Sequence, residues 1–226
     1  PASERTTREV SFEPYKAAVR EGHVGEFMSA YSGRPTGLDW NHRPCALSRL
    51  LLTDILRTEW HFDGHVTSDC DALAQIRKSD GYSSEEVISE AVKAGVDLVC
   101  GWDYAEPIVA AVENGLLHED YVDQALERLF TSRFKTGEFD PGEMVPYAAI
   151  SLDVVASQKH TDLALQAAGK SIVLLKNENN ILPLSKSPGS LAIIGPAGNE
   201  AYLGGYSGNG PYKVSPYQGI RNRLGA

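Results

Sequence analysis

The residues best suited to chemistry lie between positions 62 and 71, where a short β-type run, His65-Val66-Thr67, ends in Ser-Asp-Cys-Asp. A buried parallel strand followed by a helix pattern delivers its last residues to the carboxyl edge of a sheet, where α/β enzymes hold their reactive groups. The carboxylate of Asp69 is therefore a candidate catalytic group. The simplest alternative is that Asp69 caps the following helix, whereas Asp71 is better explained as a local cap.

The segments around this stretch alternate between strand and helix patterns. Apolar residues at helical spacing predict helices over 11–21, 45–60, 105–114 and 118–135, and Ser83 with Glu86 forms a capping-box pattern that starts a helix ending at Gly95. Strands are expected over 24–31, 65–67 and 96–100, and a long loop over 32–44. Alternation at roughly 35-residue spacing predicts parallel βα units, but three units are too few to close a barrel of about eight.

A Gly/Pro-rich piece, residues 137–142, is the best candidate for a domain boundary. After it, the pattern predicts a helix over 152–169 and strands over 171–176 and 190–196. The tail from 204 to 216 is loop-like.

Composition excludes several kinds of partner. With 42% hydrophobic residues the 226-residue chain can form a core, and its net charge of -9 argues against nucleic acid or an anionic membrane surface as partner. No window reaches the roughly 20 apolar residues of a membrane span, and the N-terminus lacks a signal-peptide pattern.

No metal or cofactor is expected from the motifs. The six histidines form no His-x-x-His or His-Glu-x-x-His pattern, and the glycines between 195 and 210 match neither a dinucleotide nor a phosphate loop. The three cysteines, Cys45, Cys70 and Cys100, are too few for a disulfide scaffold or a zinc knuckle, and burial as small apolar residues is their simplest interpretation.

Several motifs, taken in order, resemble glycoside hydrolase family 3, the family of β-glucosidases and β-xylosidases. The resemblance covers the chain from about residue 13 to 225 and is carried by Pro14–Val19, Met28–Tyr31, Leu51–Gly64, Val66–Cys70, Ala94–Leu98, Ser171–Leu184 and Ile194–Pro196. It implies an α/β fold in which residues 1–136 are the last βα units of a (β/α)8 TIM-type barrel. Residues 137–150 would then be a linker, and 151–226 the incomplete start of an α/β sandwich domain.

The same resemblance implies a retaining, exo-acting β-glycosidase in which Asp69 is the nucleophile. Tyr31 matches the residue whose hydroxyl points at the nucleophile, and Met28 matches an apolar wall of the sugar subsite. A nucleophilic carboxylate must stay ionised, and Thr67 and Ser68 are candidate hydroxyl donors to it. The acid/base glutamate of retaining members would lie beyond position 226.

The sequence departs from the usual family pattern at two positions near the site. The residue after Tyr31 is Ser32 where the family usually has Asn, and Cys70 stands where many β-glucosidases have Trp. The Ser-Asp-Cys-Asp-Ala form resembles the β-xylosidase branch, which favours xylose-sized sugars. That branch also suggests a disulfide between Cys45 and Cys70.

Two further interpretations remain open at this point. Because no acid/base is identified, the chain could be a non-catalytic fragment that binds a sugar or a partner, or one of two chains that encode complementary halves. The expected partners are a β-linked oligosaccharide or aryl glycoside and the missing parts of the same enzyme or a complementary chain. Family members are often secreted or periplasmic, but the sequence does not indicate where this chain acts.

Overall fold

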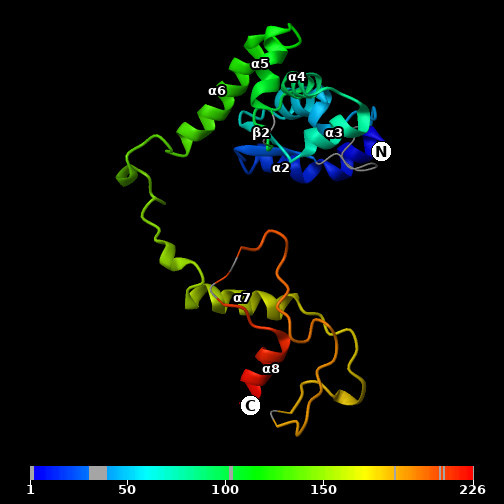
Figure 1. Cartoon of the computed structure of the whole chain (residues 1–226), viewed down its shortest axis with the longest axis vertical. Helices are drawn as coiled ribbons and strands as arrows, with labels where there is room; N and C mark the ends of the chain where they lie inside the picture. The colour runs from blue at the N-terminus through cyan, green and yellow to red at the C-terminus, as the bar shows by residue number, and fades with distance from the viewer. Residues whose placement is uncertain are drawn as a thin grey trace. The chain divides into compact units, whose positions relative to one another are not determined.

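The structure is a computed structural model that describes residues 3–30, 40–101, 104–185, 187–208, 210 and 212–225. The chain forms two compact units, Pro1–Pro146 and Tyr147–Ala226, and each is described by itself. Figure 1 colours the first unit from blue to green and the second from yellow-green to red.

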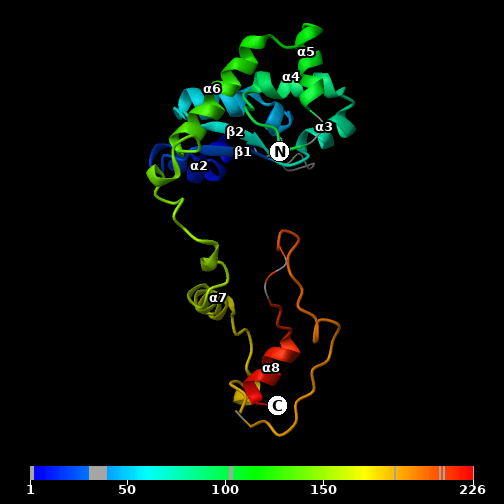
Figure 2. The same cartoon turned by 60° about the vertical axis from the view of Figure 1, so that its left-hand side comes forward.

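The sheet of the first unit is built from two parallel strands. Strand β1, Glu26–Ser29, pairs with β2, His65–Ser68, with Glu26 opposite His65 and Ser29 opposite Ser68 (Figure 2). The prediction of parallel pairing is confirmed, although β1 is shorter than the expected 24–31 strand. The connection between the two strands is long, as a parallel crossover requires.

The expected strand over 96–100 is present only as an isolated bridge between Leu98 and Thr67. The N–H groups of Asp97 and Leu98 both donate to the Val66 carbonyl, and the Ser68 N–H donates to the Leu98 carbonyl. The Cys100 N–H then donates to the Ser68 side-chain oxygen instead of to a backbone carbonyl. The ladder therefore stops after one bridge.

Helices cover this small sheet. They are α1 (Glu4–Thr6), η1 (Thr7–Ser11), α2 (Glu13–Arg20), η2 (Cys45–Leu47), η3 (Leu50–Glu59), α3 (Ala72–Asp80), α4 (Ser84–Ala94), α5 (Ala105–Glu113) and α6 (Glu119–Lys135). The helices expected over 105–114 and 118–135 are confirmed, as is the capping box of Ser83 and Glu86. The helix expected over 45–60 is instead a 3₁₀ turn followed by a π-helix, in which the Trp60 N–H reaches back five residues to the Ile55 carbonyl.

The core lies between one face of the sheet and these helices. Val66 of β2 is fully buried, and it belongs to one apolar cluster with Ile55 of η3, Ile76 of α3 and Ile88 of α4. The alternating burial of β2 explains this, because successive side chains of a strand point to opposite faces. Core packing thus fixes β2 on one face, and the end of the strand at Ser68 places Asp69 at the carboxyl edge of the sheet.

A buried ionic cluster also fixes β2. The carboxylate of Asp97 has no exposed surface, and it accepts hydrogen bonds from Arg57 of η3, from Arg128 of α6 (3.1 Å) and from the Val66 backbone N–H (2.8 Å). Burial lowers the pKa of the Arg57 guanidinium. One carboxylate therefore ties two helices to the middle of β2.

The 3₁₀ turn η4 (Gly142–Met144) lies near the end of the first unit. The second unit contains η5 (Leu152–Val154), α7 (Gln158–Ser171), η6 (Glu178–Asn180) and α8 (Pro216–Leu224). The helix expected over 152–169 begins only at Gln158. The strands expected over 171–176 and 190–196 are wrong: the described residues of this unit form no strand. An apolar run becomes a strand only when a neighbouring strand takes its backbone hydrogen bonds, and no such partner is present among the described residues of this unit. Ile172 and Ile194 are accordingly 77% and 91% exposed.

Candidate active site

Asp69 lies directly after β2, at the carboxyl end of the parallel pair. Its backbone N–H donates to the carbonyl of Ser29, the last residue of β1, at 3.2 Å. The residue is half-buried, while its neighbour Ser68 is only 1% exposed. The backbone of Asp69 thus joins the ends of the two strands.

The turn after β2 uses the backbone of Asp69 and not its side chain. The N-cap of α3 is Asp71, which adopts left-handed backbone geometry (φ 61°) and makes no side-chain capping bond. Asp69 contributes its backbone carbonyl to this turn, accepting from the Ala72 N–H at 3.1 Å. The interpretation of Asp69 as the helix cap is therefore wrong. Asp71 does occupy the cap position expected of it, although its carboxylate caps nothing.

The hydroxyl donors expected for Asp69 are bonded elsewhere. Thr67 Oγ1 donates to Glu26 Oε1 at 2.6 Å, and Ser68 Oγ accepts from the Cys100 N–H at 3.0 Å. Among the residues that the structure describes, none forms a hydrogen bond or ion pair with the Asp69 carboxylate. Neither of the two expected donors therefore holds the Asp69 carboxylate.

Of the two other candidate site residues, the structure describes Met28 but not Tyr31. Met28 lies on β1 opposite Thr67, on the sheet face that does not enter the helical core, and its side chain is 61% exposed. Leu98 is bridged to Thr67 on the other side of β2 and is 40% exposed. Met28 is thus an accessible apolar side chain one residue before the end of β1. Tyr31 lies outside the described residues.

The disulfide of this region joins Cys70 to Cys100, and Cys45 takes no part in it. The Cys45–Cys70 pairing suggested by the resemblance is wrong, as is the interpretation of Cys70 and Cys100 as buried thiols. Cys70 follows the end of β2 and Cys100 follows the bridge at Leu98, so neighbouring parallel segments bring their Cα atoms to 4.4 Å. A cysteine just after each of two adjacent segments is the sequence signal that could have identified this pair.

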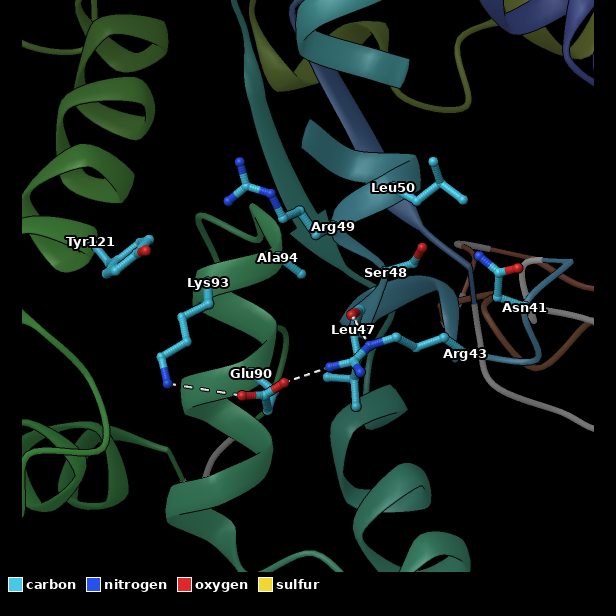
Figure 3. A pocket seen from close by; sticks show the side chains of 10 residues that line it. All are labelled: Asn41, Arg43, Leu47, Ser48, Arg49, Leu50, Glu90, Lys93, Ala94 and Tyr121. Carbon is cyan, nitrogen blue, oxygen red and sulfur yellow. Dashed lines mark hydrogen bonds and ion pairs between the residues drawn. The ribbon is translucent and has the colours of Figure 1, made fainter. Parts of the chain in front are cut away.

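A separate hollow of about 460 Å³ lies between η2, η3, α4 and α6 (Figure 3). It is lined by Asn41, Arg43, Leu47, Ser48, Arg49, Leu50, Glu90, Lys93, Ala94 and Tyr121. Arg43 pairs with Glu90, Lys93 lies 3.8 Å from the same carboxylate, and Arg49 lies 3.6 Å from Asp54. Its lining carries three cations, Arg43, Arg49 and Lys93, and one carboxylate, Glu90, and neither Asp69 nor Met28 lines it.

The described residues offer neither a metal site nor a membrane-spanning helix. No group of three or more His, Cys, Asp or Glu side chains that could hold a metal ion occurs in the part of the chain that the structure describes. No helix among the described residues is long and apolar enough to cross a membrane.

The fold and the site together define an α/β domain that presents a carboxylate at the carboxyl edge of parallel strands. The family model described as the glycosyl hydrolase family 3 N-terminal domain matches residues 1–132, and that of the family 3 C-terminal domain matches residues 172–226. The chain belongs to glycosyl hydrolase family 3, as the motifs from Pro14 to Pro196 had indicated.

Relatives of known name cover nearly all of the chain. A xylan 1,4-β-xylosidase of Xylanibacter ruminicola is 39% identical over 212 residues, which make up 92% of this chain and 24% of the relative. A solved family 3 exo-β-xylosidase in complex with a xylobiose aziridine activity-based probe is 34% identical with a TM-score of 0.79, over 93% of this chain and 27% of its own. A solved β-glucosidase from Erythrobacter marinus is 32% identical with a TM-score of 0.76, over 95% and 28%. The chain therefore spans about a quarter of the length of these relatives.

Proposed function

We propose that the protein is a retaining β-glycosidase that hydrolyses β-linked xylosides or glucosides, with Asp69 as its nucleophile. The observation that carries this proposal is the position of Asp69, whose half-buried carboxylate stands at the joined ends of β1 and β2 without a partner among the described residues. The names of the relatives, xylosidases and a glucosidase, support the substrate class. The Ser-Asp-Cys-Asp-Ala form favours the xylosides.

In the proposed reaction the Asp69 carboxylate attacks the anomeric carbon of the bound sugar. The bond to the leaving oxygen breaks as a second carboxyl group, about 5 Å from the first in retaining enzymes, gives that oxygen its proton. Water then attacks the glycosyl ester, and the second group takes the proton from the water. Met28 would supply an apolar wall beside the sugar, and Tyr31 a hydroxyl that orients Asp69. The second carboxyl group is not assigned to a residue of this chain.

The proposal includes the domain organisation. Residues 1–136 would be the last βα units of a TIM-type barrel, 137–150 a linker, and 151–226 the start of an α/β sandwich domain. The span of a quarter of the relatives supports an enzyme completed by further residues or by a complementary chain. The intact mass of the native protein tests this, because a value well above 24.5 kDa identifies the chain as partial.

Turnover of an aryl β-xyloside and an aryl β-glucoside by the native protein tests the activity. The Asp69→Asn variant removes the nucleophile without changing its size, and its kcat should fall by at least about 10³-fold. Asp71→Asn is the matched control, since Asn tolerates the left-handed geometry of Asp71 and the change removes one charge two residues away. Equal losses in both variants, or full activity in Asp69→Asn, would contradict the proposal.

A non-catalytic sugar- or partner-binding chain is the second candidate, favoured by the unassigned acid/base. It predicts that the native protein, whatever the length of its chain, binds sugar without turnover. Calorimetric titration with xylobiose, run beside the turnover assay, separates the two functions.

A further inference from the structure

The loop that carries Asp69 is attached to the neighbouring segment on both sides of the aspartate. Before Asp69, the Ser68 N–H donates to the Leu98 carbonyl at 2.8 Å, and Ser68 Oγ accepts from the Cys100 N–H at 3.0 Å. After it, Cys70 is bonded covalently to Cys100, and the Asp71 N–H donates to the Cys100 carbonyl at 3.0 Å. Cys100 is thus the partner in three of the four contacts.

These contacts restrain the part of the loop that is not packed into the core. Val66 and Ser68 are buried, whereas Asp69 is half-buried and Cys70 is exposed. Asp69 itself has one backbone bond outside the turn, from its N–H to the Ser29 carbonyl. Reduction of the disulfide would leave the exposed side of the loop, after Asp69, attached to the neighbouring segment by the single hydrogen bond from the Asp71 N–H to the Cys100 carbonyl.

A nucleophile depends strongly on its position. Reaction requires the attacking atom to be held within about 3–3.5 Å of its target, and a misplacement of about 1 Å can cost about 10²-fold in rate. A disulfide one residue after the nucleophile constrains that residue more directly than packing in the core below.

We propose that the Cys70–Cys100 disulfide is a positioning device that holds Asp69 against the end of β1 in the geometry for attack. The role as nucleophile rests on the proposed function, whereas the restraint of the loop rests on the contacts alone. The opposing explanation is a disulfide that adds only stability to the fold.

The test uses a Cys70→Ser/Cys100→Ser double variant of the native protein, with Cys45→Ser as the matched control, because Cys45 lies outside the bridge. Hydrogen exchange is followed at the N–H groups of Asp69, Asp71 and Cys100, with the buried α4 helix as internal reference. We expect exchange at the three loop amides to accelerate at least about tenfold in the double variant, while exchange in α4 is unchanged. Thermal unfolding confirms that both variants are folded under the assay conditions.

Kinetics then separate positioning from stability. We expect kcat on the aryl β-xyloside to fall at least about tenfold in the double variant with KM within about twofold, because the sugar still binds but the carboxylate is misplaced. Dithiothreitol, which reduces the bridge to two thiols as it is oxidised to a cyclic disulfide, should lower kcat of the wild type and of Cys45→Ser but not of the double variant. Labelling of Asp69 by a xylobiose aziridine, measured by mass spectrometry of its peptide, should slow in parallel.

The outcomes are distinguishable. Unchanged exchange at the loop amides overturns the restraint, whatever the activity. Faster exchange with unchanged kcat and unchanged labelling shows that the bridge only stabilises, which also overturns the proposal. If the wild type shows neither turnover nor label on Asp69, the proposed function fails, and the exchange experiment still decides whether the bridge restrains the loop.

Discussion

Asp97→Asn is the most informative single change in the fold, because it removes the carboxylate, itself without exposed surface, that pairs with Arg57 and Arg128. The amide keeps the size of the carboxylate and can still accept the Val66 N–H, but it no longer balances the two guanidinium groups. Arg57 is the more affected of the two, since its side chain is only 11% exposed, compared with 30% for Arg128. Removing one partner of a buried ion pair costs about 3–5 kcal/mol, because the remaining charge stays buried without compensation.

This free energy corresponds to a measurable change in melting temperature. For a unit of 146 residues, an unfolding entropy of about 2.1 cal/mol/K per residue gives about 0.3 kcal/mol/K, so the midpoint should fall by roughly 10–15 °C. Differential scanning calorimetry, with circular dichroism as a second probe, measures it. Glu138→Gln is the matched control, because it removes one acid from the exposed pair with Arg133 and should leave the midpoint unchanged.

A midpoint for Asp97→Asn that equals that of the control would refute the reasoning. A double variant, Arg57→Met with Asp97→Asn, provides a further check: if the cost arises from the uncompensated guanidinium, the second change should recover part of the loss. Additive losses would assign the effect to the shape of the site instead of its charge.

Three other predictions follow from local geometry. Gly64→Ala would place a Cβ 2.1 Å from the carbonyl oxygen of Gly25 and should destabilise the fold by about 1–3 kcal/mol in urea unfolding, whereas Gly25→Ala, with nothing within 4 Å, is the control. Ser83→Ala removes the N-cap of α4 and should cost about 1 kcal/mol by the same measurement, with Ser83→Gly costing less. The hydrogen bond from Arg8 lowers the pKa of Glu59 below its ordinary value of 4.5, so the folded state favours the carboxylate. This half-exposed pair contributes no more than about 1 kcal/mol, which is present above the unfolded pKa and lost as the pH falls through the lower folded value. Glu59→Gln should therefore make stability less dependent on pH below 4.5, and an unchanged acid limb would contradict this assignment.

Local signals predicted much of the first unit. The helices α4, α5 and α6 were anticipated because their apolar spacing and the Ser83 capping box act within a few residues of one another. The parallel relation of β1 and β2 followed from the alternation of strand and helix patterns at roughly 35-residue spacing. The family motifs led to Asp69 as the candidate nucleophile, a role that remains a prediction.

Other features depended on which segments meet in space. The pattern at 45–60 was compatible with one helix, but the structure contains a 3₁₀ turn and a π-helix there. The apolar runs at 171–176 and 190–196 had the composition of strands and no pairing partner among the described residues of their unit. Thr67 and Ser68 were next to Asp69 in sequence, yet their hydroxyls bond to Glu26 and to the Cys100 N–H.

By itself, the sequence determined the family, the helices α2, α4, α5 and α6 of the first unit and the position of a carboxylate just after a strand. Each of these depends on spacing or on residue types along one segment. The tertiary structure alone decided that Cys70 pairs with Cys100, that Asp97 is compensated by two arginines and that the Asp69 carboxylate is released from capping α3. These contacts join residues 30 to 40 positions apart or depend on one backbone angle, and only the packing of neighbouring segments determines which distant groups come within bonding distance.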